Sequence, residues 1–481
     1  MGDDAHRFRG STGRPPTRRL VRNAKLATLP VAYAGRRAAG VGKRAMGRPP
    51  AEVQREIQQR TAQHIFEVLG ELRGCVTKLG QLLSIYELAL PDGTGEPYRI
   101  ALRQLQDSTP AMLPPTVHAA MAASLGPDWR SQFREFDDRS AASASIGQVH
   151  RAVWQDGRAV AVKIMYPGAR AAVHGDLQQL RRISVLATVF IPGADVHSLT
   201  DGISASIEQE LDYLAEARHQ RTFAAAFADD PDFLVPEVIT QCGDVIVSEW
   251  VDGISMPRLI TSGTQAQRDR AGLLALRFVI AGWQRAGLLY ADPHPGNFRL
   301  LPDGRLGVVD FGACTPWPPA EFLAWLGDLA EAVFNGGVPA LERVIRDHGF
   351  VAPGRDIDVE AAAEMLAPLL EPLQYSTFRM STEWLGGIVR EATSPRLTNV
   401  TRQLTVPGYY TPFGRALLTA LGTLCQLGTG GALKAEFARA SPEMAAAMVA
   451  FDRRETAHLA IARAESTPAP PQSRRLRVVG D

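Results

Sequence analysis

The sequence predicts an α+β protein with two lobes, a small β-rich lobe followed by a larger helical lobe. Apolar residues recur with a period of two from about Arg134, which is typical of strands. Beyond Met256 the pattern is almost wholly helical. A helical stretch also precedes both lobes, because apolar residues recur at intervals of three, four or eight between Ala51 and Leu83.

We divide the chain into five segments on this basis. Residues 1–50 form a basic, flexible arm rich in Arg, Gly and Pro, and residues 51–118 form a helical extension. Residues 119–252 make up the β-rich lobe, and residues 253–465 make up the helical lobe. Residues 466–481 contain three Pro followed by three Arg, so we expect a disordered tail.

The composition is that of an ordinary globular protein, with 45% hydrophobic and 21% charged residues. Its four Cys stand far apart, which argues against a disulfide framework or a zinc knuckle and favours a reducing, cytoplasmic compartment. The arm carries twelve Lys or Arg against two Asp, a local balance of +10 in a chain of net charge +1. This arm is either a solvated terminus or a segment that touches an anionic membrane surface or partner. Because the remaining chain is acidic, we expect no nucleic-acid partner.

The β-rich lobe begins with a predicted hairpin. Its strands are Val149–Trp154 and Arg158–Ile164, joined by Gln-Asp-Gly, and the second strand places Lys163 on the face opposite its apolar Val and Ile residues. A lone Lys in an apolar strand requires a functional reason. A helix is predicted over residues 200–227, and another strand over residues 244–250.

One apolar stretch in the helical lobe requires a membrane test. Ala416–Leu433 contains eighteen residues without a charge, which is the shortest length that normally raises the question of a spanning helix. It is rich in Gly and Thr, and Gly428-Thr-Gly-Gly predicts that a helix ends after Leu427. We therefore expect a buried helix of about three turns in a soluble or peripherally attached protein.

The strongest chemical motif is Asp292-Pro-His-Pro-Gly-Asn297, followed by Asp310-Phe-Gly. Phosphoryl transfer uses a divalent metal that bridges the nucleotide phosphates, and a loop Asn together with a DFG Asp hold that metal. The intervening residues have hairpin pattern with a turn at Pro302-Asp-Gly. Asn297 and Asp310 are therefore predicted magnesium ligands, and Asp292 is predicted to position or deprotonate an acceptor.

Val160-Ala-Val-Lys163 supports the same chemistry, because it has the form of the strand whose Lys contacts the α- and β-phosphates. That Lys is normally held by a Glu on a helix. We predict Glu216 as the partner of Lys163. Glu210, Asp212 and Glu216 could alternatively form a solvated acidic helix face.

A Gly-rich phosphate loop is absent, and so is the P-loop pattern. An Ala/Ser segment precedes the hairpin instead, and its backbone amides could still cap phosphates although Cβ atoms stiffen it. We expect adenine to meet backbone groups of Glu249 and Val251 at the end of the strand over residues 245–250. The residues of the Ala/Ser segment predicted to contact ATP are Ala142, Ala144, Ser145, Ile146, Gly147 and Gln148.

Six motifs occur in the order typical of the UbiB/AarF-type atypical kinases, the family linked to ubiquinone biosynthesis, which the sequence resembles over about residues 50–435. They are Lys78-Leu-Gly-Gln81, the AxASIGQVH segment, VAVK, ELDYxxEA, ADPHPGN and DFG. The resemblance implies a protein-kinase-like fold whose helical extension covers the place where a protein substrate would bind. It also implies that Lys78 and Gln81 face the active site and that Glu210 and Asp212 pair with Lys78.

These observations predict an atypical kinase or ATPase that uses ATP and Mg²⁺ and supports isoprenoid-quinone or related lipid metabolism. The expected partners are a nucleotide and either an anionic membrane surface or lipid-biosynthesis proteins. A small-molecule phosphotransferase remains an alternative, because antibiotic kinases share the Asp…Asn and metal-Asp arrangement. A third alternative is a nucleotide-binding scaffold or lipid-handling protein with little turnover.

Overall fold

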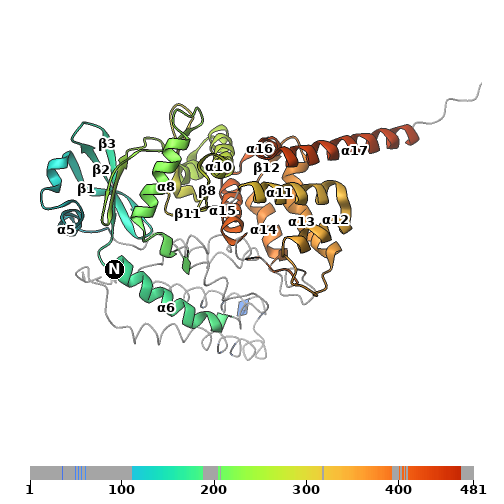
Figure 1. Ribbon diagram of the computed structural model, residues 1–481, viewed down its shortest axis with the longest axis horizontal. Coiled ribbons are helices and arrows are strands. Elements are labelled where there is room, and N and C mark those ends of the chain that lie inside the picture. Colours follow the sequence, from blue (N-terminus) through green and yellow to red (C-terminus); the bar gives the residue numbers. More distant parts are fainter. Residues whose placement is uncertain are drawn as a thin grey trace, which may run out of the picture.

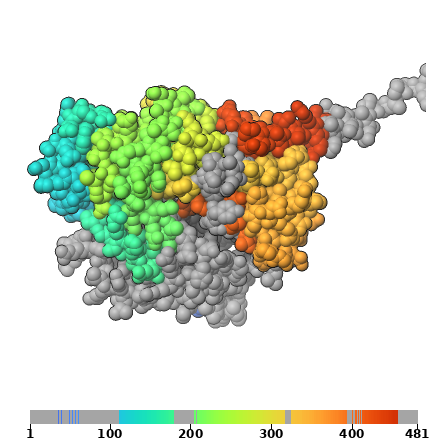
Figure 2. Space-filling view, viewed as in Figure 1, coloured from blue at the N-terminus to red at the C-terminus, as the bar shows by residue number. Residues whose placement is uncertain are grey.

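A computed structural model describes residues 111–187, 207–316, 319–392 and 410–466, together with a few single positions outside these ranges. Most of the predicted basic arm and helical extension, including Lys78 and Gln81, lies outside the described residues, as does the predicted tail after Ser466. The described part has a β-rich lobe at one end and a helical lobe at the other (Figures 1 and 2). This arrangement agrees with the predicted fold class.

The β-rich lobe is built on a five-stranded antiparallel sheet with the strand order β1-β2-β3-β6-β5. Its helices are α5, α6 and α8, and a short 3-10 helix, η1, precedes the sheet. The helices span Pro114–Leu125, Ala169–Ala187 and Tyr213–Ala226, and η1 spans Trp129–Gln132. The strands are β1 (Phe133–Ala144), β2 (Gly147–Trp154), β3 (Ala159–Met165), β5 (Val238–Cys242) and β6 (Val245–Glu249).

The period-two pattern of β3 explains how this sheet is buried. Val160, Val162 and Ile164 pack in one apolar cluster with Val117 and Met121 of α5. Met165 and Ile246 belong to a second cluster with α6 and with the start of α8. The predicted hairpin is confirmed, and α5 runs across the boundary that the sequence placed at residue 118.

Two segments of the β-rich lobe differ from the sequence prediction. The Ala/Ser segment is not a loop, because β1 pairs with β2 as far as Ala144 and Gly147 and leaves a two-residue turn. The helix predicted over residues 200–227 is interrupted at residues 210–212. The Asp212 carboxylate accepts a hydrogen bond from the Ala215 N–H at 2.9 Å and thereby starts α8 as an N-cap.

The helical lobe is organised around α10, which packs against both an aromatic cluster and α15. Two small sheets contact this helix, and their strand orders are β4-β10-β9-β7 and β11-β8. The strands are β4 (Phe233–Leu234), β7 (Ile254–Ser255), β8 (Leu288–Tyr290), β9 (Phe298–Leu300), β10 (Leu306–Val308) and β11 (Cys314–Pro316), with the 3-10 helix η2 (Pro295–Asn297) before β9. The helices are α9 (Met256–Ser262), α10 (Gln265–Ala286), α11 (Pro319–Glu331), the π-helical turn η3 (Ala332–Gly336), α12 (Gly337–Asp347), α13 (Val359–Gln374), α14 (Thr382–Ala392), α15 (Thr411–Leu427), α16 (Leu433–Ala440) and α17 (Pro442–Ser466).

The uncharged stretch beginning at Ala416 lies mostly in α15. This helix ends at Leu427 because Gly428 adopts a left-handed conformation with a φ of 61°, as the Gly-rich stop signal predicted. The strand β13 (Gly430–Gly431) follows and pairs with β12 (Phe378–Arg379). Within the ranges described above, no helix combines the length and the apolarity needed to cross a bilayer.

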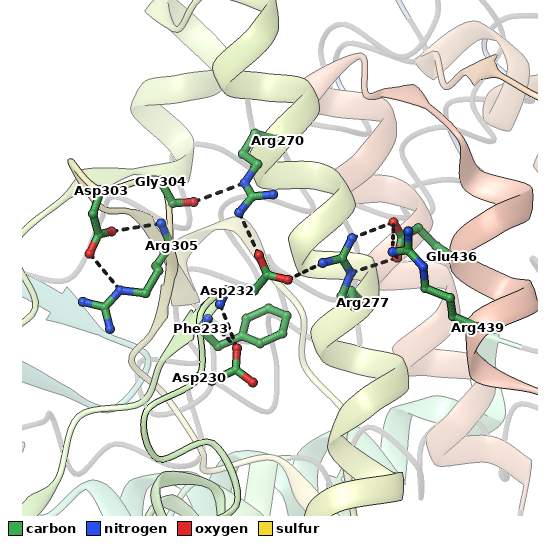
Figure 3. Close-up of polar contacts among 10 residues, drawn as sticks. All are labelled: Asp230, Asp232, Phe233, Arg270, Arg277, Asp303, Gly304, Arg305, Glu436 and Arg439. Atoms are coloured by element: carbon green, nitrogen blue, oxygen red, sulfur yellow. Dashed lines mark hydrogen bonds and ion pairs between the residues drawn. The ribbon is translucent and has the colours of Figure 1, made fainter.

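An ion network ties α10 to both sides of the helical lobe (Figure 3). The Arg277 guanidinium pairs with Asp232 before β4 and donates two hydrogen bonds, at 2.9 and 2.7 Å, to the Glu436 carboxylate of α16. Arg270 adds a bond to Asp232 at 2.8 Å, and Arg439 adds one to Glu436 at 3.0 Å. These charge-assisted contacts connect elements that are far apart in the sequence.

Candidate active site

Three charged side chains meet where β3, α8 and the chain after β10 come together. The Lys163 Nζ lies 2.6 Å from Glu216 Oε1 and 2.9 Å from Asp310 Oδ2. The side chains of Lys163 and Glu216 are 15% and 3% exposed, whereas that of Asp310 is 28% exposed. The structure therefore brings together three predicted site residues, with Asp310 the most open to a ligand.

Local structure explains the position of each member. Lys163 points away from the apolar face of β3, and its ammonium lies 5.3 Å from the centre of the Tyr213 ring. Tyr213 opens α8 directly after the Asp212 N-cap, which brings Glu216 onto the same side one turn later. Phe311 directly follows Asp310, and its side chain is fully buried in the aromatic cluster next to Phe223. This burial fixes the backbone beside Asp310.

Lys163, Glu216 and Asp310 form a triad in which one ammonium lies between two carboxylates, so negative groups outnumber positive ones. Burial works to lower the pKa of Lys163, but the charges of Asp310 and Glu216 outweigh it and raise that pKa well above its usual value. Burial raises the pKa of Glu216 to about 7, against the opposing attraction of Lys163. Lys163 is thus fixed as a cation, while Glu216 can take up a proton near neutral pH.

The turn from Asp292 to Asn297 is held by its own hydrogen bonds. The Asn297 side-chain amide donates to the Asp292 carbonyl at 3.0 Å, and the His294 N–H donates to the same carbonyl at 2.8 Å. From α15, the Thr423 hydroxyl donates to the Pro293 carbonyl at 2.9 Å. Because the amide nitrogen of Asn297 is used in this way, its side-chain oxygen remains the group available to a ligand.

The Asp310 carboxylate is also held in place by a hydrogen bond. Its Oδ1 accepts a hydrogen bond from the Gly312 N–H at 3.0 Å, which fixes the carboxylate. The Asn297 backbone lies beside the chain that leads to Asp310, since the Asn297 carbonyl accepts from the Val309 N–H at 3.0 Å. An amide oxygen and a carboxylate are both hard donors of the kind that Mg²⁺ prefers, with phosphate oxygens and water completing its shell. No cluster of three His, Cys, Asp or Glu suited to a metal occurs in the described part of the chain. The two residues therefore fit a metal that arrives with a nucleotide.

The predicted phosphate-binding segment is a tight turn with limited freedom. Ile146 is 3% exposed in the core, and its carbonyl accepts from the Tyr166 N–H at 3.0 Å. A Cβ on Gly147 would lie 2.3 Å from the Ile164 carbonyl oxygen, so glycine is required there. Ala142 and Ala144 are strand residues of β1 paired with Val149 and Gly147.

The side chain of Gln148 is buried, so its predicted contact with ATP stays a prediction that concerns its backbone groups. It accepts from the Met112 N–H at 2.7 Å and lies 2.7 Å from the His150 ring. Because both side chains are buried, Ile146 and Gln148 could contact a nucleotide only through their backbone groups. Ser145 lies in the turn itself and is half-buried.

The predicted adenine contacts lie at the end of β6. The Glu249 N–H donates to the Glu237 carbonyl at 3.0 Å, so this amide is already used and only the Glu249 carbonyl could serve adenine. Val251 follows the strand, with its side chain buried at 5% exposure.

The predicted acidic pair lies at the break before α8. Glu210 is buried, whereas Asp212 is exposed and caps α8, so Asp212 has a structural role that the sequence prediction omitted. The sequence analysis also did not single out Arg415 on α15, whose pKa is lowered by burial while the charges of Asp292 and Glu210 act to raise it. A signal existed, since Arg415 is the charged residue that immediately precedes the uncharged stretch from Ala416.

Comparisons with known proteins agree with this geometry. A family model described as the ABC1 atypical kinase-like domain matches residues 104–336. The mitochondrial atypical kinase coq-8 of Caenorhabditis elegans is 30% identical over 374 residues, which cover 73% of this chain and 48% of that protein. The mitochondrial atypical kinase COQ8 of Saccharomyces cerevisiae is 29% identical over 309 residues, which cover 63% of this chain and 60% of that protein. The chain thus spans about half the length of the curated relatives that it matches.

A solved structure extends the comparison to nearly the whole chain. The Rv3197–erythromycin complex from Mycobacterium tuberculosis matches with a TM-score of 0.61 and 38% identity. The match covers 82% of this chain and all of that one. With the order of the motifs and the assembled triad, these matches show that the chain belongs to the ABC1/UbiB family of atypical kinases, as the resemblance implied.

Proposed function

We propose that the protein binds Mg-ATP at this site and either hydrolyses the nucleotide or transfers its γ-phosphoryl group. The observation that carries the proposal is the Lys163 ammonium held by both Glu216 and Asp310. Phosphoryl transfer depends chiefly on positioning and on electrostatic stabilisation, which such a fixed cation supplies. The membership of the chain in an atypical kinase family supports the same conclusion.

Each residue has a distinct role in this proposal. Lys163 contacts the phosphates and Glu216 orients it. Asn297 and Asp310 would hold Mg²⁺, which supplies positive charge to the phosphate oxygens. Asp292 positions the acceptor hydroxyl or water, or removes its proton. The turn at Ser145 and the end of β6 would meet the phosphates and adenine through backbone groups.

Calorimetric titration of the full chain with Mg-ATP tests the site. Asp310→Asn removes a carboxylate from both the metal and Lys163, so we expect the affinity to fall at least about tenfold. Asp303→Asn is a matched control, because Asp303 lies in an exposed turn where it pairs with Arg305. Unchanged affinity in Asp310→Asn would contradict the site assignment.

The pathway is a separate part of the proposal. The resemblance to a family linked to ubiquinone biosynthesis supports a role in isoprenoid-quinone or related lipid metabolism. Profiling the quinones and lipids of a strain that lacks the protein tests this role, and an unchanged profile would contradict it. ATP turnover measured with and without lipid vesicles separates an active enzyme from a low-turnover scaffold.

A second candidate ligand is a macrolide, because the Mycobacterium tuberculosis relative at 38% identity is described in complex with erythromycin. This candidate is compatible with the alternative of a small-molecule phosphotransferase. Titration with erythromycin in the presence and absence of Mg-ATP tests it. Binding without phosphorylation of the macrolide would indicate a ligand rather than an acceptor.

A further inference from the structure

A chain of polar groups runs from the segment just before α5 to the turn that joins β1 and β2. The Gln148 side chain accepts a hydrogen bond from the Met112 N–H at 2.7 Å and lies 2.7 Å from one ring nitrogen of His150. The other ring nitrogen of His150 lies 2.8 Å from the Asp137 carbonyl oxygen. Gln148 and His150 are 1% and 0% exposed, so both side chains are shielded from water.

The two ends of this chain fix the direction of every bond in it. The Met112 N–H can only donate, and the Asp137 carbonyl can only accept. Gln148 therefore accepts through Oε1 and donates through Nε2, while His150 accepts at Nε2 and donates from Nδ1. This arrangement requires a neutral imidazole. Burial lowers the pKa of His150, which keeps the ring neutral at pH 7.

These polar side chains lie on the face of β2 that packs against α5. By the period of two, Gln148 and His150 share this face with Ala152 and Trp154, which belong to one apolar cluster with residues of α5. Burying polar groups in such a place is unfavourable unless they are hydrogen-bonded. A network whose bonds are all made then specifies one arrangement of the segments that it joins.

The opposite face of β2 belongs to the candidate site. Val149 on that face pairs with Lys163 in the register between β2 and β3. The ring centre of Tyr213 lies 5.3 Å from the Lys163 ammonium, and its hydroxyl lies 3.0 Å from the position that a Cβ on Gly147 would take. The turn at residues 145–146, which we call the phosphate turn, therefore lies beside the triad.

A second contact fixes α5 to the same part of the sheet. The His118 ring of α5 lies 2.6 Å from the Asp138 carboxylate. Asp138 follows Asp137 in β1, where the pairing with β2 shifts register between Phe136 and Ser140. The bonds thus form a circuit from α5 to β2, from β2 to β1, and from β1 back to α5. A displacement of α5 relative to the sheet would break at least one of them.

We infer that Gln148 is a positioning residue that couples the phosphate turn to the chain entering α5. The inference rests on the proposed function, because it concerns the same nucleotide. The side chain holds β2 directly after the phosphate turn, so it restricts where the turn backbone lies relative to the phosphates. Because coupling between two sites is reciprocal, a nucleotide that binds at the turn also stabilises the bond between Met112 and Gln148.

Calorimetric titration of the full chain with Mg-ATP measures this coupling. Gln148→Leu removes both hydrogen bonds at similar volume, and we expect the affinity to fall at least about fivefold. Gln148→Glu should retain more of the affinity, because a carboxyl group can accept from Met112 and share a proton with His150. Gln265→Leu is the matched control, since Gln265 bonds to Asp269 and to a backbone carbonyl within the helical lobe.

Urea unfolding separates positioning from a merely structural role. Gln148→Leu leaves the His150 ring unpaired in an apolar cluster and should lower the free energy of unfolding. The double variant Gln148→Leu/His150→Phe should recover most of that loss, because replacing both partners by apolar groups is nearly neutral. Its affinity for Mg-ATP should nevertheless stay as low as that of Gln148→Leu. Affinity that recovers together with stability would overturn the inference.

Amide hydrogen exchange gives a readout that does not depend on turnover. The peptide over residues 110–115 contains three Pro, so only three of its amides, including that of Met112, exchange. Saturating Mg-ATP should slow this exchange in the parent but not in Gln148→Leu. An equal effect in both proteins, or none in a parent that binds Mg-ATP, would overturn the inference. A parent that does not bind Mg-ATP would instead refute the proposed function on which the inference rests.

Discussion

Replacing Lys163 by Met tests the charge balance of the triad directly. The substitution keeps most of the side-chain volume but removes the ammonium that contacts Glu216 at 2.6 Å and Asp310 at 2.9 Å. Breaking a buried ion pair from one side typically costs about 3–5 kcal/mol. Because Lys163 and Asp310 are 15% and 28% exposed, solvent screens part of this loss. We expect the free energy of unfolding to fall by about 2–4 kcal/mol at pH 8.

The pH dependence provides an internal check. Glu216 has a folded-state pKa of about 7, raised from 4.5, so the folded protein takes up a proton there more readily than the unfolded chain. The stability that this proton supplies is fully present below pH 4.5 and is lost as the pH rises through 7. Without Lys163 the pKa of Glu216 should rise further. The destabilisation caused by Lys163→Met should therefore be largest at pH 8 and smaller at pH 6.

Urea unfolding followed by tryptophan fluorescence at pH 6 and pH 8 measures both effects. The double variant Lys163→Met/Glu216→Gln should recover most of the loss, because it removes the carboxylate together with its cation. Lys434→Met is the matched control, since Lys434 pairs with the largely exposed Asp452 and should lose less than about 1 kcal/mol. A Lys163→Met protein as stable as the parent at pH 8, or equally destabilised at both pH values, would refute the reasoning.

Three further predictions address other parts of the chain. Gly147→Ala should lower the free energy of unfolding by about 1–3 kcal/mol in urea titrations, because its Cβ would lie 2.3 Å from the Ile164 carbonyl oxygen; unchanged stability would contradict the tight turn. Lys78→Ala should fold normally but change the rate of ATP hydrolysis, and the parent should not phosphorylate added peptides efficiently; equal rates or robust peptide phosphorylation would remove the basis for an occluded kinase. Deleting residues 1–50 should abolish salt-sensitive co-sedimentation with anionic liposomes, because each basic residue near the surface contributes about 1 kcal/mol of binding free energy. Undiminished binding would show that the arm does not mediate it.

The sequence predicted best where local pattern and spacing carry the information. Period two in β3 identified Lys163 as the exception on its strand, and the separation between Asp292 and Asp310 left room for one hairpin. β9 and β10 form that hairpin. Glu216 was found because few acidic residues lie on the following helix. These features depend on residues close together in the chain.

The missed features depend on contacts between distant segments. The turn at Gly147 is tight because the Ile164 carbonyl lies against it, which no local pattern shows. Asp212 was predicted to pair with Lys78 or to lie on a solvated acidic helix face, and its capping role was missed, since periodicity alone does not identify a capping carboxylate. The contact of α15 with the turn after β8, through the Thr423 hydroxyl and the Pro293 carbonyl, likewise joins segments that are far apart in the sequence. Local pattern therefore predicted that Lys163 and Glu216 lie together, but not the tertiary contacts that restrict the neighbouring segments.

The ion network around Arg277 restricts where the helical lobe could be cut without separating paired charges. The ABC1 match ends at residue 336, yet Glu436, which accepts two hydrogen bonds from Arg277, lies on α16 after that boundary. A gene fragment ending there would leave the guanidinium with Asp232 alone and would expose the apolar face of α10 that α15 covers. The folding unit of the helical lobe is consequently longer than the matched domain, and a break within residues 337–440 would separate Arg277 from Glu436.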